Sequence, residues 1–489
     1  MIKDYLDEKL HEECGVFGVY RRDADLDVVG TTYYGLYALQ HRGQESCGMA
    51  VNDDGVFYKR RELGLVNDVF TKDVLETMPR GNMCIGHCRY ATTGVPVRSN
   101  AQPFVIRHIK GPMALAHNGN LTNSAELRSE FELSGAIFHS TSDTEVIAYA
   151  ITRERLSSDS IEQAVEQTMD RLKGAYSLVV MSPRKLIAAR DPHGFHPLCM
   201  GDLDGDVVFA SESCALDAVG ATFVRDIEPG ETVVVSAEGV KSLKCARKCD
   251  SSLCVFEFIY FARPDSVVDG SSVHVARLRA GAFLALDHPV QADVVIGVPD
   301  SGIDAAIGYA RQSGIPYGIG FIKNKYIGRT FIQPTQKQRQ NSVRIKLNAV
   351  RSTVEGKRVV LIDDSIVRGT TSAHIVSLLR EAGATEVHMR LTAPPFRFPC
   401  YFGTDIDSTD NLIAAHHSVE EIARIIGVDS LGFLNVEHLP KLADHSTCGF
   451  CEGCFTGKYP VDPPRDTAKL KFERSLTERR SQQTEEGSL

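Results

Sequence analysis

The sequence lacks several features, and each absence excludes a class of protein. It has no apolar run near the ~20 residues that span a bilayer, which favours a soluble protein. Its net charge of −9 argues against a general nucleic-acid-binding protein. Its first 13 residues, MIKDYLDEKLHEE, have no apolar core and no arginine, so they resemble neither a signal peptide nor a transit peptide. Together these absences predict a cytoplasmic protein that binds neither membrane nor nucleic acid.

The composition is that of an ordinary globular protein. The chain has 489 residues, which suggests two to four domains, with 43% hydrophobic and 24% charged residues. Thirteen cysteines without a secretory signal indicate a reducing compartment. There, cysteines serve as core residues, metal ligands or nucleophiles.

The hydrophobic pattern changes along the chain and predicts four regions. Residues 1–13 form an acidic lead, which we expect to be a removable propeptide or a frayed terminus. In residues 14–245, short β-rich runs alternate with helical stretches, which predicts an α+β domain with two sheets. Residues 255–440 contain βαβ units and therefore predict a parallel sheet. Residues 441–489 hold a cysteine-rich segment and a polar tail, disordered after about residue 462.

A phosphate and ribose site is predicted in VVLIDDSIVRGTTS. The strand ends at Ile362, two carboxylates follow, and a small-residue loop leads into a helix that begins near Thr371. Backbone N–H groups at such a helix start bind anions, and paired carboxylates suit sugar hydroxyls and Mg²⁺. The alternative is a capped turn with a solvated acidic pair. No Walker A motif is present, because GCFTGKY has the wrong spacing.

This run resembles the phosphoribosylpyrophosphate (PRPP) motif of type I phosphoribosyltransferases. The resemblance implies that Asp363 and Asp364 hold the ribose hydroxyls and Mg²⁺. VPDSG, residues 298–302, resembles the pyrophosphate loop and implies that Ser301 lies near the metal. The residues implied to hold the 5-phosphate are Arg368, Gly369, Thr370, Thr371 and Ser372.

A strongly basic segment lies between these two loops. Residues 323–346 hold seven basic residues and no acidic one. Such a segment is either a solvated basic face or a mobile lid that neutralises a polyphosphate. We expect a lid in which Lys325, Tyr326 and Arg329 contact the substrate.

Cys14, in HEECGVFGVY, is a candidate nucleophile. A cysteine that attacks an amide needs a base, an oxyanion hole and groups that hold the substrate. Arg89 suits a substrate carboxylate, Asp143 suits an ammonium group, and Asn118 with Gly119 suits an oxyanion. No histidine stands out as the base, but the α-amine of an N-terminal cysteine could serve. The alternative is a buried core cysteine.

These motifs resemble the N-terminal-nucleophile glutaminases, also called class II amidotransferases. The resemblance implies an αββα sandwich, with Cys14 as nucleophile, Asn118 and Gly119 as oxyanion hole, and Arg89 and Asp143 holding glutamine. Joined to a phosphoribosyltransferase, the domain resembles the glutamine PRPP amidotransferases. That family implies synthesis of 5-phosphoribosylamine for purines, a homotetramer and inhibition by purine nucleotides.

The cysteine-rich end predicts a metal site. Cys448, Cys451 and Cys454 have C-x₂-C-x₂-C spacing, which fits half a zinc site or part of an iron–sulfur site. The resemblance implies a structural [4Fe–4S] cluster on Cys254, Cys400, Cys451 and Cys454. Cys245, Cys249 and Cys448 are then spare.

Two other functions remain open on these residues alone. One is a different enzyme with the same glutaminase domain, such as asparagine synthetase or glucosamine-6-phosphate synthase, which the PRPP run and basic segment disfavour. The other is a PRPP-sensing regulator, which would not need Cys14, Arg89, Asn118 and Asp143.

Overall fold

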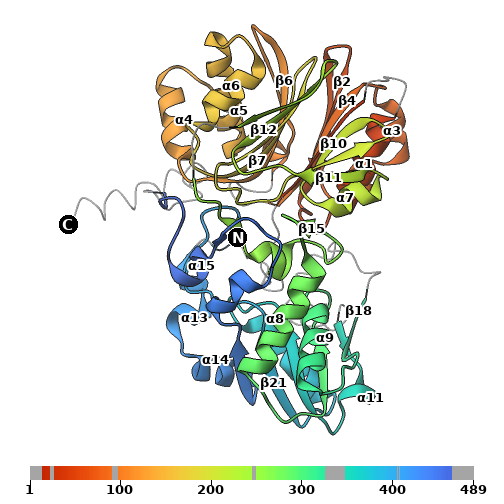
Figure 1. The fold of residues 1–489 in the computed structure, drawn as a ribbon, viewed down its shortest axis with the longest axis vertical. Helices are drawn as coiled ribbons and strands as arrows, with labels where there is room; N and C mark the ends of the chain where they lie inside the picture. The colour runs from red at the N-terminus through yellow and green to blue at the C-terminus, as the bar shows by residue number, and fades with distance from the viewer. Residues whose placement is uncertain are drawn as a thin grey trace, which may run out of the picture. The chain divides into compact units, whose positions relative to one another are not determined.

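The computed structural model describes residues 14–21, 27–90, 97–244, 249–324, 347–404, 406 and 408–464. The chain divides into two compact units (Figure 1). Among the described residues, the first unit contains 14–253 with parts of 401–407 and 459–464, and the second contains 254–400 and 408–458. In these ranges, no helix combines the length and apolar character needed to cross a membrane. The predicted propeptide 1–13 and the lid residues Lys325, Tyr326 and Arg329 lie outside the described residues.

Two antiparallel sheets form the first unit. One has the order β11 (Thr222–Asp226), β9 (Cys199–Leu203), β10 (Asp206–Ala210), β1 (Gly15–Tyr20), β4 (Met83–Arg89), β2 (Ser46–Asp53), β3 (Val56–Leu63). The other has the order β13 (Gly239–Lys244), β12 (Glu231–Ser236), β8 (Leu186–Arg190), β7 (Gly174–Met181), β6 (Gly111–Leu121), β5 (Phe104–His108). The buried residues of their facing sides pack together, as in other face-to-face sheet pairs.

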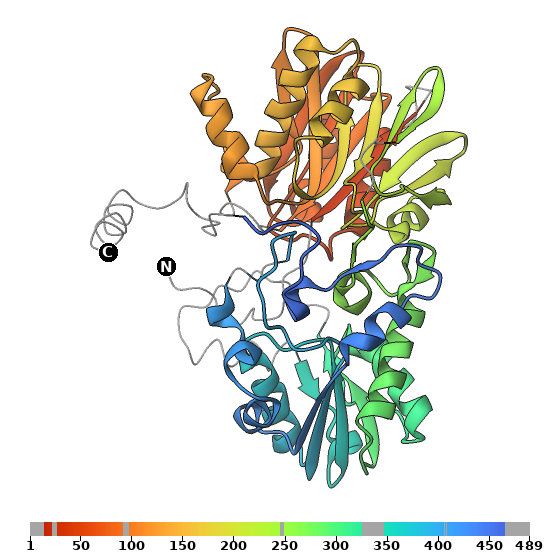
Figure 2. The same cartoon turned by 60° about the vertical axis from the view of Figure 1, so that its left-hand side comes forward.

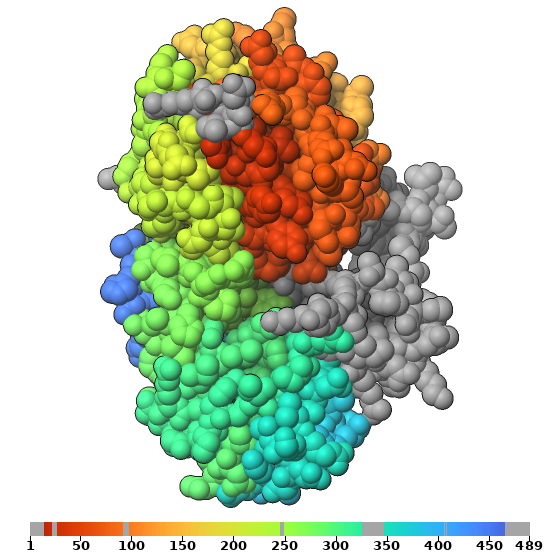
Figure 3. All heavy atoms as spheres, turned by 90° about the vertical axis from the view of Figure 1, so that its right-hand side faces the viewer, coloured from red at the N-terminus to blue at the C-terminus, as the bar shows by residue number. Residues whose placement is uncertain are grey.

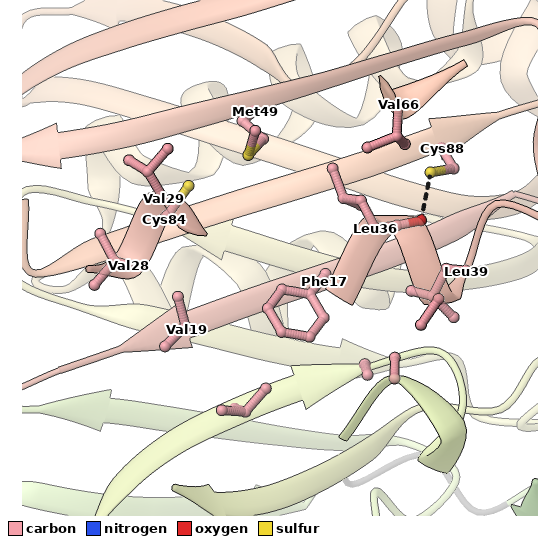
Figure 4. Packing of buried hydrophobic residues seen from close by; sticks show 14 of the residues in the cluster. Phe17, Val19, Val28, Val29, Leu36, Leu39, Met49, Val66, Cys84 and Cys88 are labelled. Atoms are coloured by element: carbon pink, nitrogen blue, oxygen red, sulfur yellow. Dashed lines mark hydrogen bonds between the residues drawn. The ribbon is translucent and has the colours of Figure 1, made fainter. Parts of the chain in front are cut away.

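Helices cover the outer face of each sheet in this unit (Figure 1). The second sheet is covered by α4 (Ser124–Leu133), α5 (Asp143–Ser157) and α6 (Ile161–Met169). The first sheet is covered by α1 (Val28–Ala38), α2 (Val66–Val69), α3 (Lys72–Thr77) and α7 (Ser213–Ala218). Figure 4 shows Phe17 of β1 beside Leu36 of α1, and Val19 of β1 toward Val28 of α1. The Cys88 thiol donates to the Leu36 carbonyl at 3.4 Å. In Figure 3, the red surface of α1 adjoins the yellow-green surface around α7.

The second unit is built around a four-stranded parallel sheet. Its order is β17 (Val294–Gly297), β20 (Arg358–Asp363), β21 (Glu386–Leu391), β22 (Ser430–Phe433). In Figure 2, α8 (Val273–Asp287) and α9 (Gly302–Ser313), in green, lie on one side of the sheet, and α14 (Val419–Ile426), in blue, lies on the other. Among its described residues, the unit also contains the α-helices α11 (Arg351–Val354), α12 (Thr370–Glu381), α13 (Ile413–His416) and α15 (Gly453–Thr456).

Short strands complete this part of the chain. Three two-stranded sheets pair β14 (Leu253–Cys254) with β23 (Phe450–Cys451), β15 (Val267–Val268) with β16 (Ser271–Ser272), and β18 (Phe321–Lys323) with β19 (Leu347–Ala349).

The predicted fold class is confirmed in both units. The helices and sheets of the first unit form the αββα arrangement, and the sheet of the second is parallel. One of the helical stretches in this region, α6, ends at Met169, and β7 begins at Gly174. Gly174 has φ +110°, a backbone conformation that glycine adopts without strain, so the chain turns there and enters the sheet.

Candidate active sites

Cys14 lies at the entrance to β1 in the first unit. The strand begins one residue later, at Gly15, whose sheet partner is Cys88 of β4. The Cys14 thiol is buried and donates a 3.4 Å hydrogen bond to the Tyr90 carbonyl. The Cys14 carbonyl accepts a 3.1 Å hydrogen bond from Nε of Arg42. Both contacts hold a residue that is not itself part of the strand.

The predicted charged partners act electrostatically on the Cys14 thiol. Burial raises the pKa of Cys14 to about 11, while the Arg89 guanidinium lowers it and the carboxylates of Asp143 and Glu45 raise it further. Arg89 ends β4, and its Nη1 lies 3.7 Å from Oε2 of Glu45. The structure therefore brings Cys14, Arg89 and Asp143 into one electrostatic environment. Glu45 is an acidic neighbour that the sequence analysis missed.

Asp143 is ionised and held by two neighbours. It begins α5, is buried, and accepts a 3.1 Å hydrogen bond from the Leu121 N–H. Nδ1 of His117 lies 3.6 Å from its Oδ1. Burial alone would raise the pKa of Asp143, but His117, the Leu121 N–H and Arg89 together lower it below its ordinary value. A buried anion here suits a substrate ammonium group.

The two predicted oxyanion residues follow His117 on β6. Asn118 is buried, and neither its amide nitrogen nor its amide oxygen has a hydrogen-bond partner within the described ranges. Unsatisfied buried amides are rare in native structures, so this one is free to bind a ligand. Gly119 has φ +134°, and a Cβ there would collide with the Ala175 carbonyl. Only glycine fits this position without strain.

No described histidine is hydrogen-bonded to the Cys14 thiol. His87, the nearest candidate along β4, uses Nε2 to contact the His117 carbonyl at 2.9 Å. Burial lowers the pKa of His87 to about 3, so its ring is neutral at physiological pH.

The second site lies at the carboxyl ends of β17 and β20. Asp363 is the last residue of β20, and Asp364 follows it; both side chains are buried. Oγ of Ser301, at the start of α9, donates a 2.6 Å hydrogen bond to Oδ1 of Asp364. Ser365 donates to the other oxygen of Asp364, also at 2.6 Å. The structure thus joins two motifs that lie 63 residues apart in the sequence.

The predicted phosphate loop leads into α12. Gly369 precedes the helix with φ +90°, and Thr370 and Thr371 form its first turn. The N–H groups at the start of this 12-residue helix have no partners within it, which favours anion binding. Ser372 is buried and Arg368 is half-buried beside them.

The first residue of the predicted basic segment, Lys323, contacts the VPDSG loop. Nζ of Lys323 lies 2.6 Å from Oδ2 of Asp300 in the VPDSG loop. Lys323 belongs to the basic segment that the sequence indicated, two residues before Lys325. The structure describes Lys323 but not the remainder of that segment from 325 to 346.

The cysteines of the second unit gather at its end. Burial strongly raises the pKa of the Cys454 thiol, and the thiols of Cys400 and Cys451 raise it further, so these three lie near one another. Cys451 is in β23, which pairs with the strand that contains Cys254. All four predicted cluster cysteines are half-buried residues of this unit. This donor set fits an iron–sulfur cluster, which thiolates bind.

Single metal ions have no preformed cage here. Across the described ranges, no three His, Cys, Asp or Glu side chains are arranged to hold one ion. Mg²⁺ does not need such a cage, because it keeps several waters and uses one or two carboxylates with substrate phosphates. Asp363, Asp364 and Ser301 supply oxygen atoms of that kind.

Two protein-family models match the two units. The model described as glutamine amidotransferase domain matches residues 87–218, and that described as phosphoribosyl transferase domain matches residues 273–393. The amidophosphoribosyltransferase of Bacillus subtilis (strain 168) is 49% identical, over 94% of this chain and 96% of that protein. The amidophosphoribosyltransferase of Archaeoglobus fulgidus is also 49% identical, over 92% and 98% of the two chains.

Solved structures agree with this assignment. The glutamine PRPP amidotransferase of B. subtilis, complexed with ADP and GMP, superposes with a TM-score of 0.87 at 48% identity, covering 94% of this chain and 100% of that chain. Both the sequence match and the fold match extend over nearly the whole chain and include both units. The chain therefore belongs to the amidophosphoribosyltransferase family, and it is an enzyme that combines a glutamine amidotransferase domain with a phosphoribosyltransferase domain.

Proposed function

We propose that Cys14 hydrolyses glutamine and that the released ammonia displaces pyrophosphate from C1 of PRPP. The products are glutamate, pyrophosphate and 5-phosphoribosylamine, in the first step of de novo purine biosynthesis. The observation that carries the glutaminase assignment is the buried Asn118 amide with no hydrogen-bond partner among the described residues. Asn118 lies between His117 and Gly119 on β6. The His117 ring is 3.6 Å from the Asp143 carboxylate, and that carboxylate raises the pKa of the Cys14 thiol.

In the first half-reaction, the Cys14 thiol attacks the side-chain amide of glutamine. With a pKa of about 11, the thiol is almost fully protonated at neutral pH and needs a base. Removal of residues 1–13 would give Cys14 an α-amine, with an ordinary pKa of ~7.7–8.0, beside the thiol. Asn118 and the Gly119 N–H then donate to the tetrahedral oxyanion. Ammonia leaves, and water hydrolyses the glutamyl thioester.

Two charged residues would hold glutamine during this step. Arg89 binds the α-carboxylate, displacing Glu45 from its 3.7 Å contact. Asp143 binds the α-ammonium group, because its lowered pKa keeps it ionised.

In the second half-reaction, the chain holds PRPP for attack by ammonia. Asp363 and Asp364 bind the ribose hydroxyls, and the loop from Arg368 to Ser372 binds the 5-phosphate. Mg²⁺, held by Ser301, Asp363 and Asp364, would neutralise the leaving pyrophosphate. Lys325, Tyr326 and Arg329 would close over the substrate.

We also propose a structural [4Fe–4S] cluster on Cys254, Cys400, Cys451 and Cys454, since no step above transfers an electron. Zinc is the alternative occupant. Inhibition by purine nucleotides, a homotetramer and a cytoplasmic location complete the proposal, which the family membership supports.

The test compares the two ammonia sources in wild type and Cys14→Ala. Wild type should hydrolyse glutamine faster with PRPP and release pyrophosphate. Cys14→Ala should lose all glutamine-dependent activity and still release pyrophosphate with ammonium chloride. If the variant lost both activities, the assignment of two separate sites would be wrong.

A further inference from the structure

Arg42 forms a buried link between the Cys14 main chain and an acidic residue far along the chain. Its Nε donates to the Cys14 carbonyl at 3.1 Å, and its Nη1 lies 2.6 Å from Oε1 of Glu212. Both side chains are fully buried, with 0% exposed surface.

Glu212 is itself fixed from several directions. Nε2 of His41 lies 2.7 Å from its Oε1, and the Cys214 thiol lies 3.6 Å from its Oε2. Burial alone would raise the pKa of Glu212, but His41 and Arg42 together hold it well below its ordinary value. The carboxylate is therefore an anion that keeps the Arg42 guanidinium in one orientation.

The same loop also fixes β1 two residues beyond Cys14. Ser211 accepts a 2.9 Å hydrogen bond from the Val16 N–H through its Oγ, and its own N–H donates to the Val16 carbonyl at 3.0 Å. The start of β1 is therefore held at two points. Ser211 bonds directly to Val16, and Glu212 holds Arg42, which bonds to the Cys14 carbonyl.

We infer that Arg42 and Glu212 are positioning residues for the glutaminase reaction, which hold the Cys14 main chain so that its thiol faces the substrate. The inference rests on the proposed function. It matters because Cys14 precedes the first sheet pair at Gly15, so strand pairing alone does not fix it. If residues 1–13 are removed, Cys14 also loses its attachment on the amino side. A displacement of about 1 Å of a reacting group can lower a rate by about 10²-fold.

The test uses the double variant Arg42→Met/Glu212→Met. Replacing both members of a buried ion pair with apolar residues of similar volume is often neutral or stabilising, whereas removing one member leaves an unpaired charge. We expect a thermal midpoint near that of wild type and a kcat for glutamine hydrolysis about 10²-fold lower. The KM for glutamine should stay within a few-fold, because neither residue binds glutamine. Synthesis from ammonium chloride should be unchanged.

Two single variants complete the test. Arg42→Lys keeps the charge but cannot donate to both partners through a planar guanidinium, so we expect a loss of kcat of about tenfold. Arg190→Lys is the matched control: Arg190 is also fully buried and donates to the carbonyls of Gly194, His196 and Ile227 at 2.8–2.9 Å. Its thermal midpoint should fall, with kcat for glutamine retained.

The outcomes separate the inference from the proposed function. A folded double variant with wild-type kcat would show that the Arg42–Glu212 pair is only structural. A kcat that falls in Arg42→Lys but is at the wild-type value in the double variant would show the same. Glutamine hydrolysis by Cys14→Ala, in contrast, would overturn the proposed nucleophile.

Discussion

The side chain of Asn120 donates a 2.8 Å hydrogen bond to the carbonyl of Tyr401, 281 residues later in the chain. Next to it, Nε2 of His196 lies 2.9 Å from the Phe402 carbonyl, and the Phe195 and Phe402 rings stack at 4.3 Å. These contacts attach residues 401–404 to the first unit beside the end of β6, which carries Asn118 and Gly119.

Asn120→Ala should therefore loosen this segment and weaken glutamine hydrolysis. Loss of one hydrogen bond destabilises the closed state by about 1 kcal/mol, which raises the equilibrium constant for local opening about fivefold. Hydrogen exchange of residues 401–404 should accelerate accordingly. Asn123→Ala is the control, because Asn123 is also buried and donates to the Arg171 carbonyl at 2.9 Å instead. Equal acceleration in both variants would contradict the prediction.

Gly119→Ala should abolish glutamine hydrolysis while synthesis from ammonium chloride persists. The added Cβ would collide with the Ala175 carbonyl and would also force alanine to φ +134°. Gly135→Ala separates these two effects, because Gly135 has φ +94° with open space around it. Backbone strain of ~1–3 kcal/mol applies to both variants, so a further loss in Gly119→Ala reflects the collision at the proposed oxyanion hole. Steady-state assays with each ammonia source measure the outcome.

The reactivity of Cys14 should depend on whether residues 1–13 are attached. The thiol of the full-length chain, with a pKa of about 11, must lose a proton to react. Its alkylation by iodoacetamide should rise about tenfold per pH unit from pH 7 to 10, where the thiol form dominates. In chains that begin at Cys14, the rate should level off near the pKa of the α-amine. Peptide mass spectrometry follows both forms, and the same pH profile in each would exclude the α-amine as base.

Asp364→Asn should lower kcat/KM for PRPP by about 10²-fold, or ~2.7 kcal/mol of transition-state stabilisation, with ammonium chloride as co-substrate. The amide keeps the shape but loses the charge that suits Mg²⁺ and ribose hydroxyls. Asp293→Asn is the control. Asp293 pairs with Arg358 at 2.8 Å, at the opposite end of β20, and is exposed. A similar loss in both variants would count against a specific role for Asp364.

Cys454→Ser should lose iron, and Cys448→Ser should keep it. The two cysteines belong to one C-x₂-C-x₂-C run, but only Cys454 is in the predicted ligand set, and the thiols of Cys400 and Cys451 raise its pKa. Metal analysis and visible absorption of anaerobically purified protein measure the difference. Stoichiometric zinc in wild type, without iron, would favour the alternative site.

Sequence motifs predicted the candidate site residues because each motif is local. Asp363 and Asp364 sit where a strand meets a helix, and Gly119 sits where only glycine fits. Arg42 and Glu212 could not be paired in this way, because 170 residues separate them and the contact exists only after the sheets assemble. Likewise, nothing in the local pattern of residues 401–404 shows that they pack on the first unit rather than the second.

The discontinuity of the first unit has a consequence for its biosynthesis. A ribosome completes residues 14–253 well before it reaches Phe402 and Tyr459, whose rings contact each other 6.1 Å apart. N-terminal domains generally fold first during synthesis. Here the nascent glutaminase acquires residues 401–407 only after residues 254–400 have been translated, and its last piece, from Tyr459, only after the whole second unit. A shortened gene that stops at residue 253 would therefore encode an unfinished domain, and partial translation products would lack a complete glutaminase.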